Sequence, residues 1–457
     1  MKRLVLAVII LGILLIVAVP VTNLFTDLPN VPLAKAAEGD PVQQAALAVL
    51  SRKCGNCHSE DYKLPFYASL PVAKGLIEKD IRTGQEYMNY AKALNSDGGK
   101  PISETVLAKT EYTIQKGEMP PGRYVALHWN GALNAAEKKA VLDWIAQVRK
   151  QHYATGAAPE FANEPLQPLK PIEGINAQKA ALGEKLYHDK RLSKDNSISC
   201  ASCHDLAKGG TDQRQYSEGV GGVFGGINSP TTLNSGYQFI QFWDGRAADL
   251  MAQADGPVNN PVEMACNWEE AGAKLLQDAE LTQAFLAVYP EGYKKETCTD
   301  AIAEYEKTLV TPNSRFDKYL MGDASALTEE ERQGYELFKA NGCATCHTGK
   351  IVGGQSFERM GRKADYFGQR EAKMTDADLG RFNFTKDEAD KHFFKTPTLR
   401  NIALTFPYFH DGSVSDLGQA VEMMAQYQVD ASLSTADRDR IVAFLKTLNG
   451  ELNGKPL

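Results

Sequence analysis

The chain has 457 residues, of which 43% are hydrophobic and 23% charged, and its formal net charge is −7. This length predicts about three domains of ordinary size, with ample material for buried cores. The acidic balance and the absence of a long basic run argue against nucleic acid as a partner, whereas a basic redox protein could still dock on such a surface.

The N-terminus carries a long apolar run. After Met1, Lys2 and Arg3, residues 4–21 read LVLAVIILGILLIVAVPV and contain no charged side chain. Such a run is just long enough to span a bilayer, and the basic residues before it favour a cytoplasmic N-terminus. We therefore predict one transmembrane anchor at residues 1–25 in the inner membrane, with the remaining domains in the periplasm. A signal peptide cleaved near Ala34-Lys35-Ala36 is the alternative.

Three copies of Cys-x-x-Cys-His lie along the chain. Two thiols at this spacing can bind both vinyl groups of one haem, and the adjacent histidine then presents its imidazole to the iron. A zinc site would need a second ligand pair nearby, and a redox dithiol would not need the histidine. The sequence therefore predicts three covalently bound haem c groups, on Cys54, Cys57 and His58, on Cys200, Cys203 and His204, and on Cys343, Cys346 and His347.

The near-regular spacing of these motifs suggests one haem for each module. We predict a mainly α fold of three cytochrome c-like haem domains, preceded by the one transmembrane helix. The expected domains are an N-terminal haem domain at 38–153, a proline-rich linker at 154–175, a second haem domain at 176–325 and a third at 326–457.

Helix signals recur around the motifs. Asp40 and Pro41 are typical of a helix start, and the helix that they begin runs into Cys54. Thr328 and Glu331 form a capping box for a helix that leads to Cys343. Apolar periodicity predicts closing helices at 135–150 and 436–448, and the second module begins with a helix at about 177–188.

Methionine opposite histidine is typical of a high-potential electron-transfer haem. In the first module Met119 precedes two prolines and is the favoured ligand, with Met88 and His128 as rivals. In the third module the candidates are Met360, Met374, Met423 and Met424. Only the last two stand just before the closing helix, and we expect one of them to be the ligand and the other a core residue.

The second module has a different character. No histidine follows His204 within it, and its methionines have no Met-Pro setting. A haem that activates a small oxidant needs an open iron position and a nearby proton donor. Glu263 is a candidate for that donor, although an isolated glutamate is more often a solvated surface carboxylate. The two remaining cysteines, Cys266 and Cys298, could form a disulfide in an oxidising compartment or remain two buried thiols.

The stretch SEGVGGVFGGINSP at residues 217–230 is rich in glycine. It lacks the GxGxxG spacing, because position 224 is Phe, and no P-loop lysine follows, so a phosphate-binding loop is disfavoured. A flexible surface loop is the simplest interpretation.

Residues 180–450 resemble the bacterial di-haem cytochrome c peroxidases. The resemblance lies in ISCASCHD, INSPTTLN, QFWDGRA, PVEMA, TPNSRFDKYL, GCATCHTG and LRNIALTFPYFHDG. With the extra haem motif and the apolar N-terminus, the whole chain resembles the tri-haem, membrane-anchored, quinol peroxidase-like branch. The resemblance implies that hydrogen peroxide is reduced to two waters by two electrons.

The resemblance also implies roles for the three haems. The haem at His204 would be peroxidatic, and the haem at His347, with Met424 as sixth ligand, would be its high-potential electron donor. The haem at His58 would collect electrons from outside.

Further residues match functional positions of the family. Glu263 matches the catalytic acid/base, Gln253 a glutamine of the distal pocket, and Trp243 a tryptophan between the two haems. Asn228, Thr405 and Pro407 match positions that hold a calcium ion, for which oxygen ligands are suited.

One position departs from the family pattern. Many members carry a histidine in the glycine-rich loop, where it blocks the peroxidatic iron until the donor haem is reduced. The corresponding residue here is Val220, which cannot bind iron. We therefore expect a peroxidatic haem that is open as isolated and needs no reductive activation.

Partners and alternatives follow from the same comparison. An anchor plus a third haem favours membrane quinol as electron donor, with a soluble cytochrome c or cupredoxin as the alternative. The family contains dimers, so a homodimer is among the expected states. The rival functions are a non-catalytic multihaem carrier, a haem-based sensor, for which no signalling domain is visible, and a protein-oxidising relative, which has tyrosine where this chain has Met424.

Overall fold

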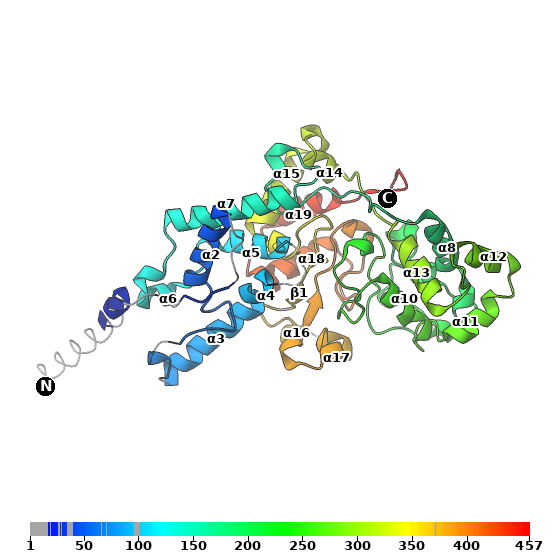
Figure 1. The fold of residues 1–457 in the computed structure, drawn as a ribbon, viewed down its shortest axis with the longest axis horizontal. Helices are drawn as coiled ribbons and strands as arrows, with labels where there is room; N and C mark the ends of the chain where they lie inside the picture. Colours follow the sequence, from blue (N-terminus) through cyan, green and yellow to red (C-terminus); the bar gives the residue numbers. More distant parts are fainter. Residues whose placement is uncertain are drawn as a thin grey trace, which may run out of the picture. The chain divides into compact units, whose positions relative to one another are not determined.

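The computed structural model describes residues 17–18, 20–25, 28, 30–33, 40–64, 66–69, 71–95, 101–370 and 372–457. The chain forms two compact units, with the boundary between Ala154 and Thr155. Helices make up most of the regular structure (Figure 1), and the described strands are two short antiparallel pairs.

The first unit is helical. Asp40 accepts hydrogen bonds from the backbone N–H groups of Val42 and Gln43, and Pro41 occupies the first helical position, as predicted. The long helices pack around a core that includes Leu50, Leu107 and Trp144. The helices are α2 (Pro41–Lys53), α3 (Pro71–Tyr87), α4 (Tyr90–Leu94), α5 (Glu104–Lys116), α6 (Gly122–Leu127) and α7 (Ala135–His152). The predicted closing helix at 135–150 is confirmed as α7.

The second unit begins with a helical cluster that is seen at the right of Figure 1. Helices α8 and α13 cross closely, because Gly183 has no side chain: a Cβ there would lie 1.8 Å from the Ala301 carbonyl oxygen. Leu186, Phe285 and Ile302 belong to the core of this cluster. Its helices are α8 (Ala177–Tyr187), α9 (Cys200–Cys203), α10 (Leu250–Asn259), α11 (Trp268–Leu275), α12 (Ala279–Val288) and α13 (Lys295–Glu306).

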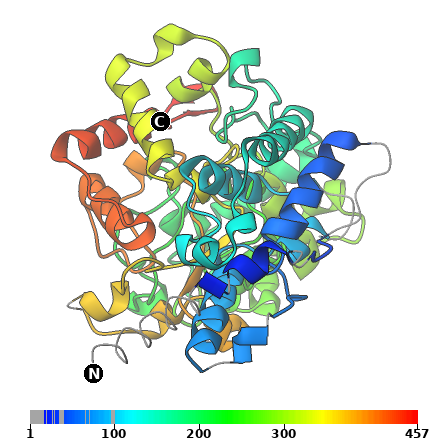
Figure 2. The same ribbon diagram turned by 90° about the vertical axis from the view of Figure 1, so that its left-hand side faces the viewer.

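The rest of the second unit has a separate core, to which Phe316, Tyr335 and Phe444 belong. The predicted capping box of Thr328 and Glu331 is present at the start of α15. Figure 2 shows α18 and α19 side by side, in orange and red. The helices are α14 (Arg315–Leu320), α15 (Glu329–Ala340), α16 (Tyr366–Gln369), α17 (Phe382–Thr385), α18 (Leu417–Met424) and α19 (Thr435–Lys446). Strand β1 (Phe357–Arg359) pairs with β2 (Phe393–Lys395), and β3 (Glu451–Leu452) pairs with β4 (Lys455–Pro456).

The prediction of a transmembrane anchor at residues 1–25, and with it the inner-membrane location, is corrected. Within the part of the chain that the structure describes, no helix combines the length and the apolar character needed to cross a membrane. Residues 1–16 and residue 19 of the predicted segment, and the alternative cleavage site at 34–36, lie outside the described residues. The fold of the described residues is mainly helical.

The disulfide considered for Cys266 and Cys298 is not formed. Both thiols are free and buried in the core shared by α8 and α10 to α13. The Cys266 thiol donates instead to the backbone carbonyl of Asn267 at 3.4 Å. The alternative of two buried thiols is therefore correct.

Candidate active site

The first haem motif directly follows α2. The Cys54 N–H donates to the Leu50 carbonyl at 2.9 Å, so the helix holds the motif in place. Cys54 and Cys57 are free, and His58 is buried with Nδ1 2.8 Å from the Met88 carbonyl oxygen. Burial lowers the pKa of His58 and so favours the neutral imidazole. A histidine held by one ring nitrogen, with the other available, is the usual arrangement of a metal ligand.

The structure separates the sixth-ligand candidates of this unit. The Met88 sulfur lies in the core and accepts a hydrogen bond from Thr110 Oγ1 at 3.8 Å. Both ring nitrogens of His128 have partners, Tyr67 Oη at 2.7 Å and the Tyr124 carbonyl at 3.1 Å. Met119 is half-buried and lies outside the core cluster. The contacts of its two rivals thus favour Met119.

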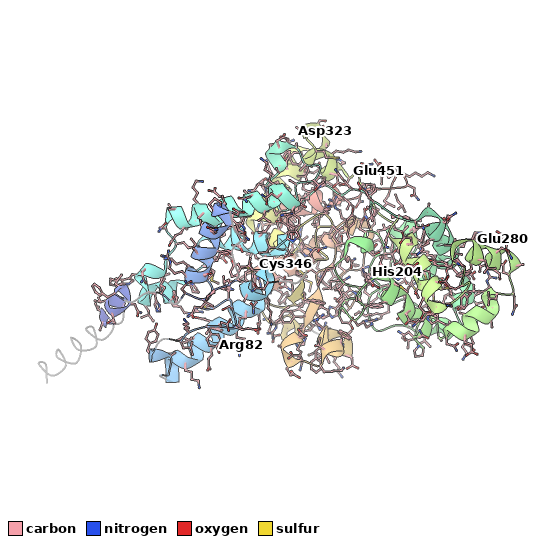
Figure 3. All side chains as sticks on the ribbon, in the orientation of Figure 1. Arg82, His204, Glu280, Asp323, Cys346 and Glu451 are labelled. Carbon is pink, nitrogen blue, oxygen red and sulfur yellow. The ribbon has the colours of Figure 1, made fainter. Side chains whose placement is uncertain are left out.

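The second motif forms the short helix α9. Two contacts hold His204 in place. Its ring Nδ1 lies 3.4 Å from the Gly210 carbonyl oxygen, and its backbone carbonyl accepts a hydrogen bond from Tyr187 Oη at 2.7 Å. Burial lowers the pKa of His204 and keeps the ring neutral. Figure 3 shows His204 and Cys346 of the third motif in separate parts of the second unit.

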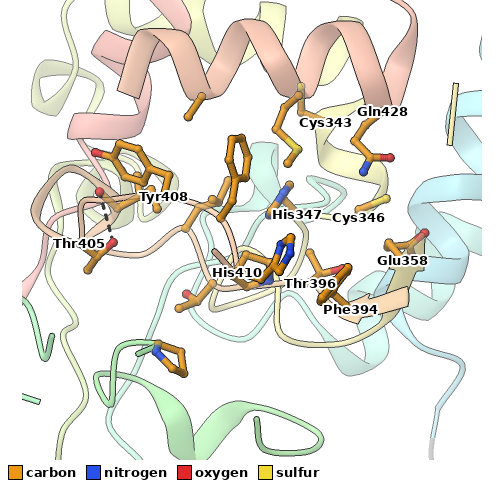
Figure 4. A pocket seen from close by; sticks show the side chains of 18 of the residues that line it. Cys343, Cys346, His347, Glu358, Phe394, Thr396, Thr405, Tyr408, His410 and Gln428 are labelled. Atoms are coloured by element: carbon orange, nitrogen blue, oxygen red, sulfur yellow. Dashed lines mark hydrogen bonds between the residues drawn. The ribbon is translucent and has the colours of Figure 1, made fainter. Parts of the chain in front are cut away.

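The third motif lines a cavity of about 230 Å³ (Figure 4). Burial lowers the pKa of His347 to about 4, so this ring is also neutral. Two cysteine side chains, a neutral imidazole and an apolar wall fit a covalently bound haem. The apolar residues of the wall include Phe338, Leu399, Leu417, Val421, Ile441 and Leu445.

The four methionine candidates of this region are placed differently. Met424 lines the cavity, whereas Met423 packs in a neighbouring cluster with Tyr408 and Val414. Met360 also lines the cavity, but its sulfur accepts a hydrogen bond from Gln428 Nε2 at 3.1 Å, and Met374 is exposed. Of the adjacent pair, Met424 is therefore the residue available to a haem.

Glu263 lies close to the second motif. Its carboxylate accepts a hydrogen bond from Asn260 Nδ2 at 2.6 Å. Burial raises the pKa of Glu263, while the Asn260 bond and the charge of Arg246 act in the opposite direction. The pKa of the Cys203 thiol is raised to about 11, chiefly by burial and in part by the charge of Glu263. Glu263 is thus a half-buried acid beside the haem motif rather than a solvated one.

The glycine-rich loop lies against Glu263. The Val220 N–H donates to the Glu263 carbonyl at 2.8 Å, and the Gly219 N–H donates to Val223 within the loop at 2.7 Å. A Cβ on Gly219 would lie 2.3 Å from the Val262 carbonyl oxygen and 2.8 Å from that of Glu263. Glycine at 219 therefore permits the close approach of the loop to the acid, and the simple surface-loop interpretation is insufficient.

This contact predicts that Gly219→Ala displaces the loop and the backbone of Glu263. We expect destabilisation of about 1–3 kcal/mol, typical of overpacking, together with a loss of any activity that depends on the Glu263 carboxylate. Gly226→Ala is the matched control, because a Cβ at Gly226 meets nothing within 4 Å. Thermal unfolding and steady-state turnover of the two variants check this prediction, and equal behaviour of the two would contradict it.

Trp243 and the predicted calcium residues meet at the junction of the two cores. Trp243 Nε1 donates to the Asn228 carbonyl at 2.9 Å, and the Asn228 N–H donates to the His410 carbonyl at 2.8 Å. Trp243, Asn228, Thr405 and Pro407 all line the cavity of the third motif. Glu263 and Gln253 are not part of this lining. Gln253 is half-buried on α10, the helix that precedes the Glu263 loop.

Sequence reasoning missed an ionic cluster next to this junction. Arg370 pairs with Asp378 and with Asp411, the latter at 3.0 Å, and His410 Nε2 lies 2.8 Å from Asp378 Oδ1. Asp378, His410 and Asp411 are close enough to hold a metal ion. Because Arg370 already pairs with both carboxylates, the group is better described as an ion-pair network. Its members come from separate segments of the chain, so no local sequence motif predicts the network.

Three family models match the chain. Residues 177–325 match di-haem cytochrome c peroxidase, residues 12–147 match a haem-binding domain and residues 331–449 match cytochrome c. Each matched range contains one Cys-x-x-Cys-His motif.

Individual relatives agree with these models. Cytochrome c peroxidase Ccp of Escherichia coli is 51% identical over 403 residues, which cover 87% of this chain and 85% of the relative. Cytochrome c551 peroxidase of Nitrosomonas europaea is 48% identical over 299 residues, which cover 64% of this chain and 85% of the relative. A crystal structure of a MauG-like protein associated with microbial copper homeostasis has 29% identity and a TM-score of 0.54, covering 62% of this chain and 92% of that one. The chain therefore belongs to the di-haem cytochrome c peroxidase family and is a haem-containing peroxidase.

Proposed function

We propose that the chain is a tri-haem peroxidase in which electrons enter at the haem of residues 38–153, pass to the haem at His347, and reach an open iron at His204. The observation that carries this proposal is the position of Glu263, half-buried beside the second motif and covered by the glycine-rich loop. A protein that only transfers electrons does not need an acid/base residue beside the haem.

The reaction consumes one hydrogen peroxide, two electrons and two protons and yields two waters. The bound haem would supply the iron centre that binds peroxide and delivers the electrons. Glu263 takes a proton from one peroxide oxygen and returns it to the oxygen that leaves. Its raised pKa suits both steps, because a carboxylate that is too acidic is a poor base. Gln253 would orient peroxide by a hydrogen bond from its side-chain amide.

Trp243 provides the connection between the two haem domains. Its indole is hydrogen-bonded to Asn228 of the second domain and packs edge-on against Phe394 and His410 of the third. The backbone of Trp243 also accepts the Lys395 N–H at 2.8 Å. An aromatic ring fixed by contacts from both sides would hold the electron path between the domains at a constant length.

Met424 is proposed as the sixth ligand of the donor haem. Replacing Met424 by Leu should lower the midpoint potential of this haem, because the thioether ligand raises it. Met423→Leu is the matched control, since Met423 does not line the cavity. Spectroelectrochemical titration of both variants measures the midpoint potential. A lower potential in the Met423 variant alone would identify Met423 as the ligand and Met424 as the core residue.

Calcium is proposed at the junction, held by oxygen atoms of Asn228, Thr405 and Pro407. Asn228 is buried and its side-chain N–H groups donate to the carbonyls of Arg214 and Gln215, which leaves its side-chain oxygen for another partner. Oxygen ligands of this kind suit calcium. Chelation should reduce turnover, and added calcium should restore it; turnover insensitive to a calcium chelator would contradict the site.

The proposed donor is quinol, with a soluble cytochrome c or cupredoxin as the alternative. The match to Escherichia coli Ccp extends over most of the chain, whereas the aligned length in the Nitrosomonas europaea relative is close to that of unit 155–457 alone. Relative to the shorter relative, this chain therefore has an additional N-terminal haem domain. An electron donor different from that of the shorter relative would explain this domain. A homodimer stays a prediction of the family resemblance.

Steady-state assays with quinol and with reduced cytochrome c decide between these donors. We expect turnover with quinol that is lost when Cys54 and Cys57 are both replaced by Ser, while a small artificial reductant still supports turnover of that variant. Turnover with cytochrome c alone would establish the alternative.

A further inference from the structure

A buried lysine lies in the wall of the donor-haem cavity. Lys395 is the last residue of β2 and only 4% of it is exposed. Its ammonium group donates to the side-chain carbonyl of Gln238, and its side chain lines the cavity that also contains Cys343, Cys346 and His347. Gln238 lines the same cavity, so the two polar groups meet inside a mainly apolar space, to whose lining Glu358 and Arg362 also belong.

The charge of Lys395 has no acidic partner among the residues that the structure describes. No carboxylate lies within salt-bridge distance of its Nζ. The acid whose charge acts on it, Asp244, already pairs with Arg246 at 3.0 Å. Burial removes hydration from the ammonium group and lowers the pKa of Lys395 to about 7, while the charge of Asp244 acts in the opposite direction. A neutral amide compensates an ammonium only in part, and buried charges are normally paired.

A haem bound in the cavity would supply an anionic partner for the Lys395 ammonium group. The macrocycle carries two propionate carboxylates, and the wall of this cavity is otherwise mainly apolar. A carboxylate beside Lys395 would compensate both charges at once. The gain is large because a pair at low dielectric interacts far more strongly than one in water.

We propose that Lys395 is a positioning residue for the donor haem, forming with Gln238 a subsite for one of its carboxylates. This inference rests on the proposed haem at His347 and extends it to the control of its potential. A positive charge close to the iron favours the ferrous state, so Lys395 would help to keep this haem a high-potential donor. Its N–H bond to the Trp243 carbonyl ties the same subsite to the residue proposed to connect the haems.

Redox titration of the holoprotein tests the subsite. The variants are Lys395→Met, which removes the charge, Lys395→Arg, which keeps it, and Gln238→Leu, which removes only the amide partner. Lys391→Met is the matched control, because Lys391 lies four positions away on the surface and pairs with Glu388. Haem content is measured first, so that each variant is compared at full occupancy.

We expect Lys395→Met to shift the reduction equilibrium of the donor haem at least tenfold towards the ferric form, which corresponds to 59 mV for a one-electron couple. The midpoint potentials of Lys395→Arg, Gln238→Leu and Lys391→Met should stay close to that of the wild type.

If Lys395 only supports the fold through Gln238, Lys395→Met and Gln238→Leu will lose stability equally and leave the potential unchanged, which overturns the proposal. If Lys395→Met does not fold, a wild-type potential in Lys395→Arg together with a lowered one in Gln238→Leu would also overturn it. Peroxide turnover of the wild type is measured separately, so failure of the subsite is distinguishable from failure of the peroxidase assignment.

Discussion

Glu263→Gln is expected to lower peroxide turnover by roughly 10²- to 10⁴-fold, the usual contribution of a positioned acid/base. The amide keeps the size of the side chain and can still contact Asn260, so the loop and the haem spectra should be preserved. What is lost is the ability to take a proton from one oxygen and deliver it to the other. Stopped-flow and steady-state assays with peroxide measure the loss.

The control for this variant is Glu280→Gln, because Glu280 lies in the same helical cluster, is exposed, and pairs with Lys185 at the surface. It should retain wild-type turnover. Wild-type activity in Glu263→Gln would remove Glu263 from the mechanism and return it to a structural role.

The raised pKa of Glu263 also predicts a pH dependence. The first step requires the carboxylate, so kcat/KM should fall as the pH decreases through the pKa of Glu263. Because burial raises that pKa, the fall should occur at a higher pH than for an ordinary glutamate. Glu263→Gln should lack this acid limb, and a limb that persists in the variant would assign it to another group.

Val220→His is expected to convert an open peroxidatic haem into a blocked one. The Val220 N–H is hydrogen-bonded to the Glu263 carbonyl, and the Val220 side chain is half-buried on the loop that lies against Glu263. An imidazole at this position should bind the ferric iron and exclude peroxide. We expect a low-spin ferric haem and at least a tenfold slower reaction of the oxidised enzyme with peroxide, about 1.4 kcal/mol in the barrier, with activity recovered after reduction.

Electron paramagnetic resonance of the oxidised proteins measures this change. The wild type should contain a high-spin ferric haem that disappears in Val220→His. Val223→His is the matched control, because Val223 lies on the exposed part of the same loop. Three low-spin haems in the oxidised wild type would show that another residue blocks the iron and that Val220 has no such significance.

The sequence predicted those parts of the fold that depend on local chemistry. Asp40 with Pro41, and Thr328 with Glu331, mark helix starts because their side chains and backbone interact within one turn. The three Cys-x-x-Cys-His motifs are recognisable for the same reason, since the residues expected to bind each haem lie within five positions. Closing helices α7 and α19 follow from apolar periodicity alone.

The rest depends on contacts between distant residues. The sequence does not distinguish Gly219 from the other glycines of its loop, because its close approach to the Glu263 backbone depends on the folded structure. Lys395 and Gln238 meet across more than 150 positions, and neither carries a motif. The prediction of an N-terminal anchor was wrong, and the choice between a disulfide and two buried thiols for Cys266 and Cys298 stayed open, for a related reason: composition indicates what a segment could form, but not which structure it adopts.

The most direct test of the account is the stoichiometry of peroxide reduction by the purified holoprotein, with donor oxidation, peroxide loss and oxygen release recorded together. The account predicts continuous turnover in which each peroxide consumes two electrons, no oxygen appears, and Glu263→Gln slows the reaction by roughly 10²- to 10⁴-fold without loss of haem. Oxidation of the three haems without further peroxide consumption would identify an electron carrier and contradict it.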